Sequence, residues 1–323
     1  MSRPAAAFGA LTVVGAGAAA YGTLIERNLF TLRRFDVPVL APGSSPLRIL
    51  HVSDLHITAG QARKQRYVAA LAGLQPDLVV NTGDTISDPK AVRSVLNCLR
   101  PLADFPAVFV PGNNDYYEPR PSTPARYFRG TIPRPRGAQM PWTEVAGGLA
   151  GQGWIELTNA RTVLTCAGRR VALGGVDDPH LERDRYELIS GPADPTADVR
   201  LAVLHSPEPR LLERYSADGY DLALAGHTHG GQVRVPFGPA IVTNCGIDVH
   251  RARWLNRFDD RLWLHVCAGL GTNPYMPVRF ACRPEASLLT LVGRDRPAGR
   301  VRRARVDRPH SRRGRRLSTA QSS

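Results

Sequence analysis

Seven side chains in five separated motifs have the chemistry of a metal site. They are Asp54, His56, Asp84, Asn113, His205, His227 and His229. Imidazole nitrogens and carboxylate or amide oxygens suit Mn, Zn or Fe, and no thiolate is implied. Each motif alone has an ordinary explanation, since Gly83-Asp84 is a common turn and a lone histidine is usually structural. Five such motifs in one chain, each after a hydrophobic run, make coincidence the weaker explanation.

Two of the motifs carry their ligands two residues apart, as Asp54-x-His56 and His227-x-His229. The side-chain period of an extended segment is two, so we expect each motif to project both side chains to the same side. Asp84 can bridge two cations through its two carboxylate oxygens. Two metals about 3.5–4 Å apart clamp phosphoryl oxygens and lower the pKa of a bridging water. The motifs therefore predict a pair of divalent metal ions and phosphoester chemistry.

Short apolar runs precede these motifs and predict buried β-strands. Each run is rich in β-forming residues and bounded by Gly, Pro, Asp or Asn; the runs are 47–53, 77–83, 107–112, 170–176, 200–206 and 221–226. Helical stretches at Gln65–Leu74 and Lys90–Leu99 lie between the early runs. The alternation predicts a layered α/β sheet, which binds ligands at the carboxyl ends of its strands. We therefore expect the ligands, together with Asp177 and Asp178 after the fourth run, to share one rim.

The motifs resemble those of calcineurin-like metallophosphoesterases, over roughly residues 20–292. The matching segments are SDLH (53–56), TGD (82–84), GNND (112–115), LHSP (204–207) and GHTHGGQ (226–232). Tyr21, Ile25-Glu26, GVDDP (175–179) and GLGTNPYMPVRFACRPE (269–285) resemble the bacterial membrane-associated branch of that superfamily. Some members of that branch are described as UDP-diacylglucosamine hydrolase-like, and others as cell-envelope phosphoesterases. The resemblance implies a four-layer α/β/β/α sandwich, here expected over 45–293.

The resemblance also implies two ligand sets that share Asp84. One metal would be held by Asp54, His56, Asp84 and His229, and the other by Asp84, Asn113, His205 and His227. A hydroxide bridging the two metals would attack phosphorus in line, as in a phosphodiesterase, phosphomonoesterase or pyrophosphatase. The expected catalytic residues are Asp84, Asn113, Asn114 and His205.

Two positions depart from the family pattern. Asn114 stands where the third motif usually has a histidine that stabilises the transition state or protonates the leaving group. An amide donates a hydrogen bond but is no general acid at neutral pH. The leaving group would then depart with help from water, from another histidine such as His180, or unaided. The acidic residue usually found three positions after the bridging Asp is four positions on, at Asp88.

The N-terminal end predicts attachment to a membrane. Residues 5–25 carry no charge, and a helix of that length spans roughly 30 Å, about one hydrocarbon core. We expect residues 1–26 to be a membrane anchor, or a signal peptide cleaved near Ala18–Ala20, in preference to a soluble Ala-rich helix. Flanking arginines lean towards a cytoplasmic enzyme domain, whereas a signal peptide would place that domain outside. The side of the membrane therefore stays open.

The C-terminal end holds most of the basic charge. Residues 294–323 carry eleven Arg and two Asp, which leaves +14 − 9 = +5 for the rest of the chain. Low apolar content predicts a disordered tail. It either attracts anionic lipid headgroups or has no specific partner, and nucleic acid is the less favoured partner because it rests on this tail alone.

The cysteines and one insertion leave further expectations. Five cysteines without CxxC spacing predict buried or incidental thiols instead of disulfides or a zinc knot. The aromatic and Pro-rich stretch 116–142 either forms a lid or membrane-facing loop over the metals, or only packs on the domain. The predicted substrate is an envelope or lipid-linked phosphoester. The alternative is a metal-binding envelope regulatory protein with degenerate activity, which Asn114 favours and the complete ligand set opposes.

Overall fold

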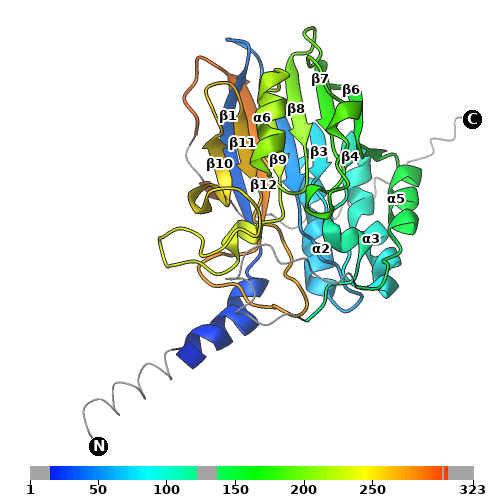
Figure 1. Cartoon of the computed structure of the whole chain (residues 1–323), viewed down its shortest axis with the longest axis vertical. Coiled ribbons are helices and arrows are strands. Elements are labelled where there is room, and N and C mark those ends of the chain that lie inside the picture. Colours follow the sequence, from blue (N-terminus) through cyan, green and yellow to red (C-terminus); the bar gives the residue numbers. More distant parts are fainter. Residues whose placement is uncertain (1–14, 122–136, 300–301, 305–323) are drawn as a thin grey trace, which may run out of the picture.

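Two β-sheets face each other at the centre of the molecule, with helices on their outer surfaces (Figure 1). The structure is a computed structural model that describes residues 15–121, 137–299 and 302–304. The first sheet has the order β13-β1-β12-β2-β3-β4-β5. Its strands are β1 (Thr31–Leu40), β2 (Leu47–Val52), β3 (Leu78–Asn81), β4 (Ala107–Phe109), β5 (Ile155–Glu156), β12 (Glu285–Gly293) and β13 (Arg302–Ala304).

The second sheet has the order β10-β11-β9-β8-β7-β6. Its strands are β6 (Ala160–Cys166), β7 (Arg169–Gly175), β8 (Val199–Val203), β9 (Leu222–Ala225), β10 (Trp254–Arg257) and β11 (Trp263–Val266). Both sheets are mixed, but β2, β3 and β4 run parallel in the first and β7, β8 and β9 run parallel in the second. The parallel strands therefore deliver their carboxyl ends to a common edge, as expected from the sequence.

Three hydrophobic clusters separate four layers. The middle cluster lies between the sheets and includes Ile49 and Leu201. An outer cluster packs the first sheet against α2 (Ala62–Ala70), α3 (Val92–Leu99) and α5 (Trp142–Gly151). The other outer cluster packs Leu211 and Tyr215 of α6 (Pro209–Ala217) against Ala202 and Ala223 of the second sheet. The predicted α/β/β/α sandwich is confirmed.

The six predicted strands and two predicted helices are present with shifted ends. Helix α2 begins before the predicted Gln65 and continues into a 3-10 turn at Leu71–Leu74, whereas α3 follows a 3-10 turn at Pro89–Ala91. Strand β1 precedes residue 45, where the predicted domain begins, and pairs in parallel with β12 from Thr31 to Leu40. The five cysteines are free thiols, as expected, and four of them are buried.

The structure describes the N-terminal end only from residue 15. Residues 15–20 are helical and lead into a π-helical turn, Tyr21–Ile25, and a 3-10 turn, Glu26–Asn28. Within the described part of the chain, no helix has the length and apolar character to cross a membrane. Residues 1–14, including the start of the predicted 5–25 segment, lie outside the described residues, and so do 122–136 of the predicted lid.

The predicted disordered tail contains one short strand. Strand β13 pairs antiparallel with Leu32–Arg34 of β1, because β1 would otherwise leave its outer backbone groups unpaired at the sheet edge. Disorder therefore does not hold for Arg302–Ala304. Residues 300–301 and 305–323 of the tail lie outside the described residues.

Candidate metal centre

The loops that follow five strands bring the predicted ligands to one edge of the sandwich. Asp54 and His56 follow β2, and Asp84 follows β3. The remaining ligands follow β4, β8 and β9; they are Asn113, His205, His227 and His229. Five of the seven residues are buried. Asn113 and His229 are partly exposed, and the His229 side chain has an exposure of 13%.

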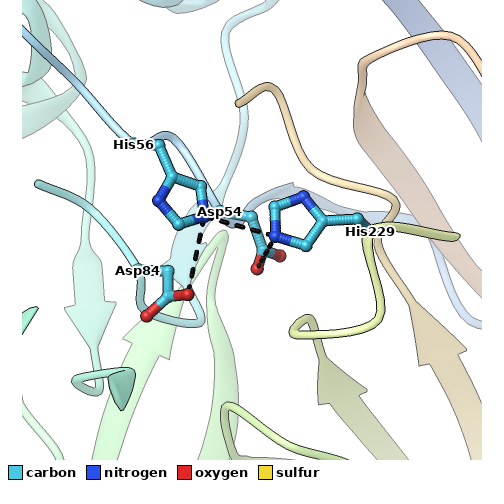
Figure 2. Close-up of side chains that lie close together, drawn as sticks. All are labelled: Asp54, His56, Asp84 and His229. Carbon is cyan, nitrogen blue, oxygen red and sulfur yellow. Dashed lines mark hydrogen bonds and ion pairs between the residues drawn. The ribbon is translucent and has the colours of Figure 1, made fainter. Parts of the chain in front are cut away.

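The first predicted ligand set converges on one point (Figure 2). His56 Nε2 lies 3.2 Å from His229 Nε2 and 3.5 Å from Asp84 Oδ2. His229 Nε2 lies 3.5 Å from Asp54 Oδ1. One ligand atom from each of the four residues falls within 4.8 Å of all the others. Two ring nitrogens and two carboxylates at this spacing fit a divalent cation between them.

The second predicted set adjoins the first through Asp84. His205 Nε2 lies 3.5 Å from Asp84 Oδ2, and His227 Nδ1 lies 3.3 Å from His205 Nε2. Asn113 Oδ1 is buried and has no hydrogen-bond partner. A buried amide oxygen without a partner is costly unless a ligand satisfies it. The residues present therefore fit a second cation beside Asp84.

Backbone geometry brings the ligands together in a way that differs from the sequence prediction. Asp54 and His56 have φ angles of +47° and +42°, so the segment that leaves β2 is not extended. His227 and His229 also have positive φ, at +67° and +50°. The predicted alternation along an extended chain is wrong for both pairs. Left-handed residues in tight loops point the side chains inward instead, and each costs about 1–3 kcal/mol.

Three of the imidazole rings are oriented by contacts on their far side. His205 Nδ1 donates to the carbonyl of Thr82 at 2.7 Å, which leaves Nε2 to face Asp84. His56 Nδ1 lies 2.6 Å from Ser87 Oγ. His227 Nε2 lies 3.3 Å from the carbonyl of Asn244, so Nδ1 faces His205. Such contacts fix the tautomer and direction of metal-binding histidines.

Burial and neighbouring charges set the protonation of the metal-free site. Burial lowers the pKa of His56 to about 4, so that ring is neutral and free to ligate at neutral pH. Burial also raises the pKa of the Asp54 carboxyl to about 6. Burial alone would lower the pKa of His205, but Asp84 and other carboxylates hold it well above its usual value. An anionic pocket of this kind favours cations.

Asn114 and Asp115 of the third motif hold the loops together. Asn114 donates to both carboxylate oxygens of Asp84, from its backbone nitrogen at 2.8 Å and its Nδ2 at 2.6 Å. Asp115 is buried and accepts from the backbone nitrogens of Thr85, Ile86 and Gly112. Both residues therefore fix Asp84 relative to the loop after β4.

Asp177 and Asp178 reach the rim but support a loop there. Asp177 accepts from the Tyr116 hydroxyl at 2.9 Å and pairs with Arg183 at 3.1 Å. Asp178 is buried and accepts from the backbone nitrogens of His180 and Leu181. These two carboxylates hold the turn that carries His180.

Asp88 lies away from the converging ligands and caps the 3-10 turn Pro89–Ala91 by accepting from the Lys90 nitrogen. Ser87 occupies the third position after Asp84, where the family usually has the acidic residue, and contacts His56. A hydroxyl therefore contacts the Nδ1 side of this ring. The sequence signal for it was the one-residue displacement of Asp88.

Two buried basic residues that the sequence reasoning missed also hold the ligand loops. Lys64 Nζ donates to the carbonyls of Leu55 and His56, at 2.7 and 3.2 Å. Arg279 is fully buried and donates to the carbonyls of Ala268, Gly269, Gly271, Cys282 and His229. Arg279 lies within the 269–285 motif, but its neighbours in sequence give no sign that its side chain is buried.

A cavity of about 260 Å³ opens beside the ligands. Its polar lining includes Asp84, Asn113, Asn114, His180, His227 and His229. Its apolar lining includes Val233, Ile241, Val242 and Met276. No Lys or Arg is among the described residues that line it. The cavity can therefore hold a phosphoester beside the ligands together with an apolar group.

Comparisons with known proteins agree with the geometry. Residues 47–231 match the model of the calcineurin-like phosphoesterase family. The uncharacterised protein YpbG of Bacillus subtilis is 30% identical over 88% of this chain and 96% of its own. Phosphodiesterase YaeI of Escherichia coli is 27% identical over 88% and 96%. A zebrafish (Danio rerio) protein named as a transmembrane protein with a metallophosphoesterase domain is 26% identical over 86% and 61%. The match covers most of the strands and all seven predicted ligands, and the chain belongs to the calcineurin-like phosphoesterase family.

Proposed function

We propose that this phosphoester hydrolase uses two divalent cations that share Asp84. The observation that carries the proposal is the convergence of Asp54, His56, Asp84 and His229 within 4.8 Å. The partnerless Asn113 Oδ1 supports the second cation, since Asn113 lines the same cavity as Asp84 and His227. Mn, Zn and Fe all suit this mixture of nitrogen and oxygen ligands.

The residues of the chain position the reaction in this proposal. When bound, the cations supply Lewis acidity and an activated water. Asp84 is held in place by two donors of Asn114, and His205 is directed by the Thr82 carbonyl. Preorganised groups of this kind stabilise charge that develops in the transition state without having to rearrange.

Protonation of the leaving group is the weak point of the site. The amide of Asn114 is committed to Asp84 and has no acidic proton to give at neutral pH. His180 lines the same cavity. We therefore infer a preference for phosphoesters with good leaving groups.

The cavity favours a substrate with an apolar portion. Its lining includes Val233, Ile241, Val242 and Met276, which complement a hydrocarbon better than a second charged group. The uncharged run 5–25 supports delivery of the enzyme to a membrane, and the Arg-rich tail 294–323 supports attraction to anionic headgroups. We propose an envelope or lipid-linked phosphodiester as substrate, with the enzyme associated with the membrane through residues 5–25.

A panel of phosphoesters tests the activity. Diesters, nucleotide pyrophosphates and lipid phosphates are offered with Mn²⁺, Zn²⁺ or Fe²⁺ to the full chain and to Asp84→Asn. Asp88→Asn is the matched control, because Asp88 is not among the converging side chains. It caps a 3-10 turn, where Asn also caps well, and accepts from the Ala59 nitrogen at 3.4 Å. We expect Asp84→Asn to lose at least a hundredfold in turnover while Asp88→Asn stays within twofold. Activity that survives Asp84→Asn would refute the two-cation mechanism.

The second candidate function is a metal-binding regulatory protein without turnover. Asn114 favours it, because the usual general acid is missing. Metal titration separates the two functions: binding of two cations by the wild-type chain with no turnover of any ester, even a p-nitrophenyl diester, would favour the regulatory protein. Turnover of that diester would exclude it.

A further inference from the structure

Three uncharged segments lie at one end of the molecule, and two of them contribute residues to the cavity (Figure 1). In the sequence, residues 5–25, 235–247 and 271–278 contain no Asp, Glu, Lys or Arg. Figure 1 shows the N-terminal helix at the same end of the molecule as the yellow and orange loops that contain the other two segments. Such composition is unusual for three neighbouring surface segments of a chain whose charged residues make up 22%.

Contacts of these segments with the residues that flank them join the three, and the Gly22 carbonyl also accepts from the Arg279 backbone nitrogen at 3.2 Å. The ring of Tyr21 lies edge-on to Phe280 with centroids 6.5 Å apart, and Phe280 pairs with Val233 through a β-bridge. Gln232 Nε2 donates to the carbonyl of Met276 at 2.8 Å. The π-helical turn, the loop after His229 and the loop before Arg279 therefore form one continuous surface.

Large hydrophobic side chains concentrate on this surface, which we call the apolar face. Of the nine exposed large hydrophobic residues in the described part of the chain, seven lie here: Tyr21, Leu24, Ile25, Val235, Phe237, Ile241 and Tyr275. Phe237 is fully exposed, with a relative accessibility of 109%. The other two, Val163 and Leu188, lie elsewhere in the fold.

The face lacks charge partly because its own arginine turns inward. Arg234 is 6% exposed and donates to the carbonyls of Gly230 and Gly238, at 2.8 and 2.9 Å. The chain thus withdraws the guanidinium and presents Val235 and Phe237 at the tip of the same loop. Exposed aromatic and aliphatic side chains without neighbouring charge are unfavourable in water but suit the interface of a bilayer.

We infer that the apolar face docks on a phospholipid bilayer, with Phe237 entering the interface and the cavity opening towards the lipid headgroups. The uncharged residues 5–14 precede the helix that joins this face, so the chain itself continues from it with an apolar segment. Ile241 belongs both to the face and to the cavity wall. The substrate class that follows, a phosphoester carried by a membrane lipid, rests on the proposed function, whereas the docking does not.

A fluorescent label tests docking independently of activity. Phe237→Cys and Leu188→Cys variants of the full chain carry an environment-sensitive dye, and the unsubstituted chain gives the background from its five cysteines, of which Cys245 is half-buried. Leu188 is a matched control because it is 70% exposed but lies away from the apolar face. The segment that follows its turn contacts Asp218, which precedes β9, whereas His227 follows the other end of that strand. Vesicles of phosphatidylcholine and phosphatidylglycerol are then added.

We expect the label at position 237 to shift to shorter wavelength and brighten at least twofold with vesicles, and the label at 188 to stay unchanged. A domain that is merely tethered by its N-terminal segment leaves both labels in water, and that result overturns the docking. A second result would also overturn the docking: the label at 237 does not respond to vesicles, and light scattering shows that Phe237→Ser loses self-association. The apolar face would then be a contact between two copies of the chain.

Kinetics of Phe237→Ser test the substrate class. The side chain makes no buried contact that the substitution would remove, so hydrolysis of a soluble p-nitrophenyl diester should stay within twofold of wild type. Hydrolysis of a lipid phosphodiester in vesicles should fall about tenfold or more, because loss of one aromatic side chain weakens partitioning of the enzyme onto the vesicles by about that factor. Equal loss in Leu188→Ser would refute the lipid substrate. Failure of wild type on both substrates would refute the proposed function while leaving the label result to decide docking.

Discussion

The buried Arg279 makes a prediction about how the metal site keeps its shape. Its guanidinium reaches five backbone carbonyls, and the three shortest contacts run from Nη2 to Gly271 at 2.6 Å, Ala268 at 2.7 Å and Gly269 at 3.1 Å. Nη1 also lies 3.4 Å from the carbonyl of His229, a predicted ligand. Arg279→Lys keeps the positive charge but replaces a planar fork of five donors by one ammonium group. Most of these carbonyls must then lose their partner.

The magnitude follows from the number of short bonds. A hydrogen bond from a charged donor contributes about 1.5–3 kcal/mol, so losing two of the three short ones costs about 3–6 kcal/mol. In a domain of this size each kcal/mol shifts the midpoint of thermal unfolding by about 2–4 °C. We therefore expect Arg279→Lys to unfold at least about 6 °C lower than wild type. Mn²⁺ affinity should also fall about tenfold or more, because the carbonyl of His229 loses support.

Thermal unfolding in EDTA measures the hydrogen-bond effect apart from metal binding, and calorimetric titration measures the affinity. Arg93→Lys is the matched control, because Arg93 is exposed on α3. That variant should match wild type in both measurements. If Arg279→Lys in EDTA unfolds within 2 °C of wild type, the carbonyls have other partners and the reasoning about Arg279 is refuted.

Four further predictions concern single groups of the site. Ser87→Ala removes the contact with His56 Nδ1 and should weaken Mn²⁺ binding about 10–100-fold in a titration; unchanged affinity would show that the hydroxyl does not orient the ring. Since burial raises the pKa of Asp54 to about 6, protons should compete with metal below that pH, and calorimetry should give affinity that rises from pH 5 to pH 6 and then levels off for the first cation. Binding of the second cation should release about one proton at pH 7. Burial lowers the pKa of His205, but Asp84 and other carboxylates outweigh it and hold that pKa well above its usual value. Equal heats of binding in buffers of different ionisation enthalpy would contradict this proton release. Asn114→His should raise the turnover of esters with poor leaving groups and change the turnover of esters with good leaving groups little. If turnover of the poor substrates does not rise while both metals are bound, the role assigned to Asn114 is wrong.

The sequence could predict the strands and the identity of the ligands because both follow from local rules. Apolar runs such as 77–83 become strands wherever both faces are buried, and polar residues after parallel strands meet at one edge. The pairing of β1 with β12 could not be predicted, because residues 31–40 and 285–293 are far apart in the chain and neither is followed by a ligand. Asp177 and Asp178 share the rim with the ligands, and only their partners show that they support a loop.

The geometry of the ligands depends on residues outside the ligand motifs. Five of the seven predicted ligands have positive φ, namely Asp54, His56, Asp84, His227 and His229. Non-glycine residues keep that conformation only when their surroundings determine it, at about 1–3 kcal/mol each. Here Lys64 holds the carbonyls beside His56, and Arg279 holds the carbonyl of His229. The strain of the ligand loops is therefore carried by the folded domain, through buried side chains that lie outside the ligand motifs.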